Sequence, residues 1–276
     1  MTENREPKRI RKRIRKRKTD TDTDTDTDVR TDVRTIRLTV AYDGTGFVGW
    51  QRQGRGESIQ GLIEAALSAI DRAPVTLHGA GRTDAGVHAL AQVASARLTT
   101  PIADAQLARA LNAHLPPAIR VTSVETMPAA FHARFSAIAK SYEYRIWNGP
   151  TLPPFIRSYA WHIPERLDVA AMREATPAIV GAHDFAAFRG SRAVNHTTIR
   201  TITEAGWTMD GAALTFAIGG TGFLRYMVRS LVGTLVEIGR GARPVDHLAR
   251  LLASPDRAAA GRTAPPHGLF LVRVDY

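Results

Sequence analysis

Residues 79–96 read GAGRTDAGVHALAQVASA, and this stretch is the most informative part of the chain. Its first half surrounds Arg82 and Asp84 with glycine and alanine, which let a backbone turn sharply and approach a ligand closely. The loop lies between two runs that are predicted to be strands, 75–78 and 92–98. An aspartate presented on such a loop is a candidate nucleophile or base, although Asp and Gly also form ordinary turns.

The sequence outside this stretch alternates between strand and helix patterns. Predicted strands occupy 36–40, 120–125, 141–147, 199–208, 213–218 and 269–274, and predicted helices occupy 58–70, 103–114, 167–175, 223–238 and 245–253. Ser58 is a good N-cap for the first helix, and Asp210-Gly211 is a good hairpin turn between two apolar runs. This order predicts an α+β fold with a mixed, largely antiparallel sheet.

The charge of the chain favours a polyanionic partner. The net charge is +11, of which residues 1–34 supply +4, from 12 Lys and Arg and 8 Asp and Glu. The remaining +7 is spread over the rest of the chain, where arginine dominates. Arginine binds phosphate through two parallel hydrogen bonds and stacks on bases, so RNA or DNA is the expected partner.

Residues 1–34 are of low complexity, with a run of Lys and Arg followed by alternating Thr and Asp. Such a segment buries too little apolar surface to offset the entropy of ordering, so a disordered tail is predicted. It is either an arm that binds nucleic acid or an extension without a function of its own. No apolar run reaches the ~18 residues that span a bilayer, and no apolar segment follows the basic stretch, so we expect a cytoplasmic protein.

Several kinds of site are disfavoured by the sequence. The chain has no cysteine, which excludes disulfides, thiolate zinc sites and a cysteine nucleophile, and its histidines are not at metal-ligand spacing. Residues 44–49, GTGFVG, match the dinucleotide-binding pattern, but no helix pattern follows at once. This segment is interpreted as a glycine-rich loop, in which Trp50 either meets RNA or packs inside. No cofactor and no metal are expected.

Four long segments in order resemble the tRNA pseudouridine synthase A family. They are GAGRTDAGVHALAQVASA, AYDGTGFVGWQRQ, FHARFSAIAKSYEYRIWN and GTGFLRYMVRSLVGTLVEIGRG, with HDFAAF in the expected place among them. Together they cover the chain from about Thr35 to Tyr276. The region Arg189–Thr198 is less like the family than its surroundings, which indicates a variable loop that contacts the substrate.

This resemblance implies that the chain isomerises uridine to pseudouridine at positions 38, 39 and 40, in the anticodon stem-loop of tRNA. The reaction needs a carboxylate, which by analogy is Asp84, and it needs neither a nucleotide cofactor nor a metal. The resemblance leaves three roles open for Asp84: attack on C1′, attack on C6, or removal of a ribose proton.

The resemblance also implies roles for four other residues. Arg229 would pair with the Asp84 carboxylate, Arg82 would help to extrude the target nucleotide, Tyr142 would stack on the uracil, and Leu224 would line its pocket. Each position has a simpler interpretation. Arg229 lies beside an apolar helix stripe and can extend to solvent, Arg82 is a rival partner for Asp84, and Tyr142 and Leu224 can be core residues.

The family fold consists of two pseudo-related halves that share one sheet around a central cleft. We therefore expect an N-terminal catalytic half at 35–149 and a C-terminal half at 150–276 after the disordered tail. The resemblance also implies a homodimer. Two other functions stay open: a non-catalytic RNA-binding protein of the same fold, and a nucleoside hydrolase, which usually needs a second carboxylate.

Overall fold

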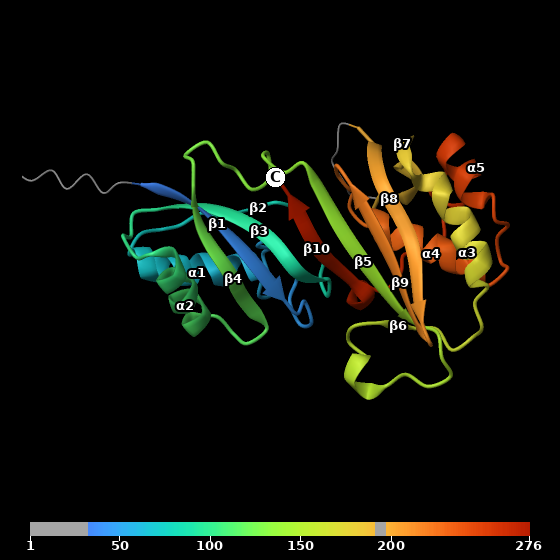
Figure 1. Cartoon of the computed structure of the whole chain (residues 1–276), viewed down its shortest axis with the longest axis horizontal. Helices are drawn as coiled ribbons and strands as arrows, with labels where there is room; N and C mark the ends of the chain where they lie inside the picture. The colour runs from blue at the N-terminus through green and yellow to red at the C-terminus, as the bar shows by residue number, and fades with distance from the viewer. Residues whose placement is uncertain (1–32, 191–196) are drawn as a thin grey trace, which may run out of the picture. The chain divides into compact units, whose positions relative to one another are not determined.

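The computed structural model describes residues 33–190 and 197–276 (Figure 1), and the described residues belong to one compact unit. Most of the predicted tail at 1–34 and most of the variable loop at 189–198 lie outside the described residues.

The described residues build one ten-stranded sheet (Figure 1). Its strands are β1 (Arg34–Tyr42), β2 (His78–Gly79), β3 (His88–Leu98), β4 (Ile119–Met127), β5 (Ala139–Trp147), β6 (Trp161–His162), β7 (Gly181–Asp184), β8 (Ile199–Asp210), β9 (Ala213–Gly220) and β10 (Leu269–Asp275). The order is β4-β1-β3-β10-β5-β9-β8-β7, with β2 paired to β3 and β6 paired to β5. Only the β10–β3 and β5–β6 pairs among them are parallel, so the predicted mixed, largely antiparallel sheet is confirmed.

Helices accompany this sheet at two places. The α-helices are α1 (Ile59–Asp71), α2 (Asp104–His114), α3 (Val169–Ala175), α4 (Met227–Gly239) and α5 (His247–Ala253). Short 3-10 helices occupy Pro154–Ile156, Thr176–Ile179, Ala186–Phe188 and Pro266–Gly268. Figure 1 shows α1 and α2 alongside β1 and β4, whereas α3, α4 and α5 lie alongside β8 and β9. Among the described residues, no helix combines the length and the apolar character that crossing a membrane requires.

Elements set by local chemistry agree with the sequence predictions. The first predicted helix is α1, and the Ser58 side chain accepts a hydrogen bond from the Gly61 N–H at 3.2 Å. The predicted hairpin is β8–β9, and Gly211 has the positive φ, +57°, that such a turn requires.

Two predicted elements begin at least three residues later than expected, and the strand predicted at 92–98 begins earlier, at His88. The strand predicted at 75–78 is not formed before His78, because the Val75 and Leu77 N–H groups donate to Ser68 Oγ and Glu64 Oε1 instead of to a neighbouring strand. The helix predicted from 223 begins at Met227, because Tyr226 has the left-handed φ of +66° and interrupts the helical path.

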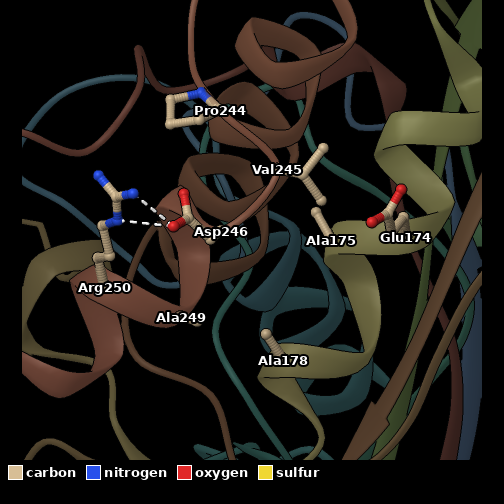
Figure 2. Close-up of a pocket in the computed structure, with 8 residues that line it drawn as sticks. All are labelled: Glu174, Ala175, Ala178, Pro244, Val245, Asp246, Ala249 and Arg250. Atoms are coloured by element: carbon tan, nitrogen blue, oxygen red, sulfur yellow. Dashed lines mark hydrogen bonds and ion pairs between the residues drawn. The ribbon is translucent and has the colours of Figure 1, made fainter.

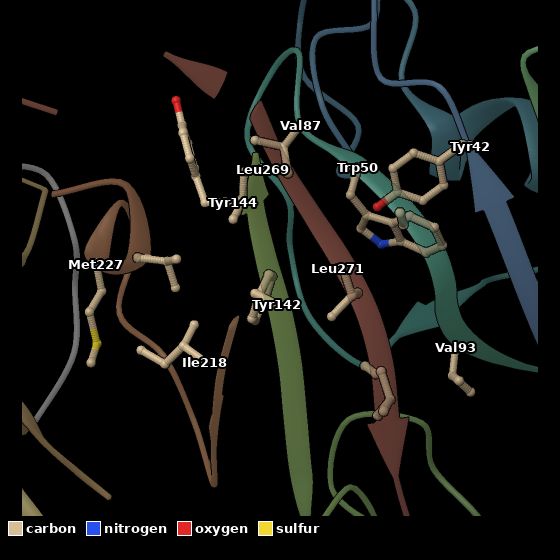
Figure 3. Close-up of a cluster of buried hydrophobic side chains, with 14 of the residues drawn as sticks. Tyr42, Trp50, Val87, Val93, Tyr142, Tyr144, Ile218, Met227, Leu269 and Leu271 are labelled. Carbon is tan, nitrogen blue, oxygen red and sulfur yellow. The ribbon is translucent and has the colours of Figure 1, made fainter. Parts of the chain in front are cut away.

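The last strand, β10, lies inside the sheet and joins its two sides, β4-β1-β3 and β5-β9-β8-β7. It pairs with β3 through Phe270–His88 and Leu271–Ala89, and with β5 through Leu271–Tyr142. Figure 3 shows the buried side chains there, with Tyr42 and Trp50 on one side, Ile218 and Met227 on the other, and Tyr142 and Leu271 between them. The C-terminal residues therefore complete the core beside the strand that follows the Asp84 loop.

The Leu271→Ala variant tests this role of β10. Leu271 is fully buried, so the substitution leaves a cavity, and the free energy of unfolding should fall by about 2–5 kcal/mol. Urea unfolding of the variant measures the loss. Met209→Ala is the control, because Met209 is 56% exposed on β8 and its truncation should cost about 0.5 kcal/mol or less. Equal losses in the two variants would contradict the central position of β10.

Candidate active site

The Asp84 loop is the backbone between β2 and β3, and it is fixed on both sides of Asp84. The Thr83 hydroxyl hydrogen-bonds the buried Tyr42 hydroxyl at 2.8 Å, and the Thr83 carbonyl accepts the Trp50 N–H at 3.1 Å. On the other side, the Val87 N–H donates to the Asp84 carbonyl at 3.1 Å, which closes a turn with Gly86 at φ +75°. The carboxylate therefore projects from a preorganised backbone.

The glycine-rich loop at 44–49 packs directly against the Asp84 loop. A Cβ on Gly44 would lie 2.1 Å from the Val87 carbonyl oxygen, and a Cβ on Gly49 would lie 2.7 Å from the Thr83 carbonyl oxygen. The glycines thus permit two backbones to touch, which explains the pattern without a dinucleotide. Trp50 is only 2% exposed, so the packing interpretation of this residue is confirmed.

The Asp84 carboxylate is held by an arginine from a distant part of the chain. Arg229 Nη1 donates to Asp84 Oδ2 at 3.2 Å, and Arg229 Nε donates to the Ala264 carbonyl at 2.8 Å. The Arg229 side chain is 13% exposed and that of Asp84 is 20% exposed. Arg229 therefore points inward to the carboxylate and not to solvent, and its second hydrogen bond fixes its direction.

A second arginine, which was not among the residues predicted from the sequence, lies beside Asp84. Arg225 Nε lies 3.5 Å from Asp84 Oδ1, and its side chain is half exposed. Both guanidinium groups lie over the Tyr226 ring, with Arg225 at 4.6 Å and Arg229 at 5.1 Å from the ring centroid. The only sequence signal was a second basic residue in FLRYMVR, four positions before Arg229.

Arg82, the rival partner, is exposed two residues before Asp84. The structure gives it no hydrogen bond or ion pair with another described residue. Arg229 and Arg225, not Arg82, are therefore the cations that meet the carboxylate.

Opposing effects act on the protonation of Asp84. Burial raises the pKa of the carboxyl above its ordinary value, while the charges and hydrogen bonds of Arg229 and Arg225 oppose that rise. A carboxylate in this position is poorly solvated but electrostatically supported, which is the environment of a reactive carboxylate.

Tyr142 and Leu224 are buried side chains on two other elements, β5 and the turn before α4. Tyr142, on β5, is 8% exposed, and its ring meets Phe223 edge-on with centroids 5.0 Å apart. Burial, followed by the charges of Tyr42 and Asp84, raises the pKa of the Tyr142 phenol. Leu224 is 4% exposed in the turn before α4. Tyr144, two residues after Tyr142, is fully buried and donates its hydroxyl to the Pro265 carbonyl.

Two hollows among the described residues lie outside this place. Figure 2 shows one of about 530 Å³ between α3 and α5, where Arg250 is paired with Asp246. The other, of about 560 Å³, adjoins β2 and β3 and is lined by His78 and His132 among other residues. Neither includes Asp84, so the central cleft expected at Asp84 stays a prediction.

Comparison with known proteins identifies the family to which this chain belongs. Residues 38–136 and 175–276 match the family model described as tRNA pseudouridine synthase. The chain belongs to the tRNA pseudouridine synthase family. This membership confirms the resemblance of the sequence motifs, the predicted fold class and the predicted class of enzyme, an isomerase.

Individual relatives in this family are similar over nearly their whole length. The tRNA pseudouridine synthase A of Syntrophotalea carbinolica is 44% identical over 241 residues, which are 87% of this chain and 96% of the relative. The protein of the same name from Afipia carboxidovorans is 45% identical over 87% of this chain and 98% of its own. That of Methylacidiphilum infernorum is 42% identical over 87% and 94%.

The ionisation of Asp84 can be measured directly by carbon NMR of its labelled carboxyl group. We expect a pKa above the ordinary 3.8, because burial outweighs the two arginines. In Arg229→Gln one lowering charge is gone, so the pKa should rise further. Arg250→Gln, which removes an exposed arginine on α5, should leave it unchanged. An Asp84 pKa that falls in Arg229→Gln would overturn this account of the ion pair.

The contact between the two loops can be tested with Gly49→Ala. Gly49 has φ +106°, and the added Cβ would press on the Thr83 carbonyl, so about 1–3 kcal/mol of folding free energy should be lost. Thermal or urea unfolding measures this loss. Gly54→Ala is the matched control in the same segment, because its Cβ would meet nothing within 4 Å. A Gly49→Ala protein as stable as Gly54→Ala would show that the loops are not tightly apposed.

Proposed function

We propose that this chain converts uridine to pseudouridine at positions 38, 39 and 40 in the anticodon stem-loop of tRNA, with Asp84 as its catalytic carboxylate. The observation that carries the proposal is the partly buried Asp84–Arg229 pair on the motif loop of a chain that belongs to this family. A protein that only bound RNA would have no need to desolvate a carboxylate and then neutralise it.

The chemistry requires one carboxylate and no redox partner. The N1–C1′ bond breaks, the uracil turns, C5 bonds to C1′, the proton on C5 is lost and N1 gains one. Asp84 serves this sequence by attack on C1′, by attack on C6, or by removing a ribose proton, and all three need it ionised. Arg229 supports that ionised state through its hydrogen bond to Oδ2.

The surrounding residues suit the handling of a flipped base. A base inside a stem must leave the helix to react, which costs a few kcal/mol. In this proposal Arg82, exposed on the Asp84 loop, helps to extrude the nucleotide and holds its phosphate. Tyr142 stacks on the uracil, and Leu224 lines its pocket. Arg229 positions the carboxylate.

The proposal also covers the binding partner, the oligomeric state, the cellular location and the two halves of the chain. The partner is tRNA, in keeping with the net charge of +11. The active form is a homodimer, in which one protomer grips the body of the tRNA while the other acts on the anticodon arm. The protein works in the cytoplasm. Residues 35–149 form the catalytic half, and residues 150–276 form the half that completes a central cleft.

The decisive test is release of tritium from tRNA labelled at C5 of uridine. The intact protein should release tritium, because C5 loses its hydrogen when it becomes the attachment point. Asp84→Ala and Asp84→Asn should abolish release while tRNA still binds. Asp210→Asn, an exposed aspartate at the end of β8, is the matched control and should retain full activity.

Each other outcome of this assay selects another function. Binding of tRNA without tritium release by the intact protein would favour the non-catalytic RNA-binding protein. Free uracil among the products would favour the hydrolase. Full release by both Asp84 variants would mean that another group is the catalytic carboxylate, and a monomer that stays active at its dilution limit would remove the homodimer.

A further inference from the structure

The segment between β4 and β5 holds an exposed aromatic side chain that the reaction at Asp84 does not use. Phe135 is 77% exposed. It belongs to residues 132–136, here called the His132 turn. The neighbouring Ile138 is also exposed, at 63%.

The His132 turn is rigidly built, so the exposure of Phe135 does not come from a loose loop. His132 Nδ1 accepts the Arg134 and Phe135 N–H groups at 3.1 and 3.4 Å. The Ser136 N–H donates to the His132 carbonyl at 2.9 Å, and the Ser136 hydroxyl accepts the His132 N–H at 3.1 Å. Four hydrogen bonds within five residues thus hold the turn that carries Phe135.

The turn is also anchored to the sheet through Ala133, which is fully buried. The Ala133 N–H donates to Ser95 Oγ on β3 at 3.0 Å, and its carbonyl accepts the Tyr276 hydroxyl at 2.8 Å. A strand and the C-terminal residue therefore fix the direction in which Phe135 points.

Flat rings line up beside Phe135. The His132 ring lies 4.5 Å from the Phe135 ring, and the His78 ring lies 4.8 Å from the His132 ring, each centroid to centroid. A hollow of about 560 Å³ lies against His78 and His132, which is within the ~300–1,000 Å³ typical of small-ligand sites. The arrangement offers three aromatic rings, each tilted by 34° to the next, beside an open space.

Positive charge surrounds these rings. Arg134 lies 5.6 Å from the Phe135 ring, and Arg97 borders the hollow. Lys140 lies beside the Asp84 loop, because a Cβ on Gly81 would be 3.4 Å from Lys140 Cε. Within residues 33–190 and 197–276, no ion pair involves Arg97, Arg134 or Lys140. Burial and the charge of Arg134 lower the pKa of Lys140, so an anion between these two cations would relieve their repulsion.

We propose that Phe135 on the His132 turn is a stacking platform for an unpaired base of the RNA substrate, and that Arg134 and Lys140 bind the phosphate next to that base. Base–aromatic stacking beside arginine is a general means of holding single-stranded nucleic acid. The inference rests on the proposed function for the identity of the RNA. It concerns a nucleotide other than the one that reacts at Asp84.

A second copy of this chain is a poorer occupant of the same surface. A two-fold contact centred on this patch would bring Arg134 and Lys140 close to the same cations of the other copy. Like charges at such a distance disfavour the contact, whereas the phosphates of RNA neutralise them.

The test uses an anticodon stem-loop RNA with the fluorescent base 2-aminopurine placed at each loop position in turn. Stacking on an aromatic ring quenches this base. With the full-length protein, we expect quenching at one position to be lost in Phe135→Ala and kept in Phe135→Trp. The Kd of Phe135→Ala for the RNA should rise roughly 5- to 100-fold. Arg134→Gln should lower the slope of log Kd against log salt by about one.

Phe155→Ala is the matched control. Phe155 is 88% exposed in the segment after β5, whereas Phe135 lies in the segment before this strand. Phe155→Ala should bind and quench as the unaltered protein does. The same Kd for the two alanine variants, with no position whose quenching depends on Phe135, would overturn the platform.

Two further outcomes distinguish the platform from a contact between copies and from the proposed isomerase activity. If Phe135→Ala sediments as a smaller species and saturating protein still quenches every position, the surface is a contact between copies and the platform is wrong. If quenching depends on Phe135 but the unaltered protein releases no tritium from C5, the platform stands and the proposed isomerase activity fails.

Discussion

The ion pair between Asp84 and Arg229 is the constraint around which the rest of the molecule is arranged. A carboxylate in a largely desolvated position needs a cation at hydrogen-bond distance, and here that cation is 145 positions away in the chain. Asp84 lies on the loop before β3, and Arg229 lies on the first turn of α4. The Thr83–Tyr42 hydrogen bond fixes the loop beside Asp84, and the hydrogen bond to the Ala264 carbonyl fixes Arg229. The sheet must therefore hold both elements in one register.

The C-terminal strand makes that register possible. β10 lies between β3 and β5, so residues from the end of the chain join the strand that follows Asp84 to the strand that carries Tyr142. On the other side, Gly44 and Gly49 let a second loop touch the backbone of the Asp84 loop, where any side chain would intrude. Backbone contacts on two sides leave the Asp84 loop little room to move, which is the preorganisation that a reactive carboxylate requires.

The difference between local and long-range contacts also separates the features that the sequence could predict from those that it could not. Local chemistry was sufficient for α1, with its Ser58 cap, and for the β8–β9 hairpin, with Gly211 at its turn. Long-range contacts were not readable. β3 starts at His88 because β10 pairs there, and β2 is short because Glu64 takes the Leu77 N–H. At the site, Asp84 and Arg229 followed from the motifs, whereas Arg225 did not, since nothing local shows that the turn at Tyr226 directs it to the same carboxylate.

One strand relates the reacting site to the proposed platform. β3 begins at His88, four residues after Asp84, and its Ser95 holds the His132 turn, so both sites are tied to the same rigid element. Strands rise about 3.3 Å per residue, which puts the ends of this span roughly 20 Å apart. Because the protein fixes that spacing, an RNA that contacts both proposed sites must match it. Unstacking a base costs a few kcal/mol, and stacking a second base on Phe135 returns about 1–3 kcal/mol of that cost. A rigid strand with a carboxylate near one end and an aromatic face near the other thus favours an RNA that is already distorted toward the reactive geometry.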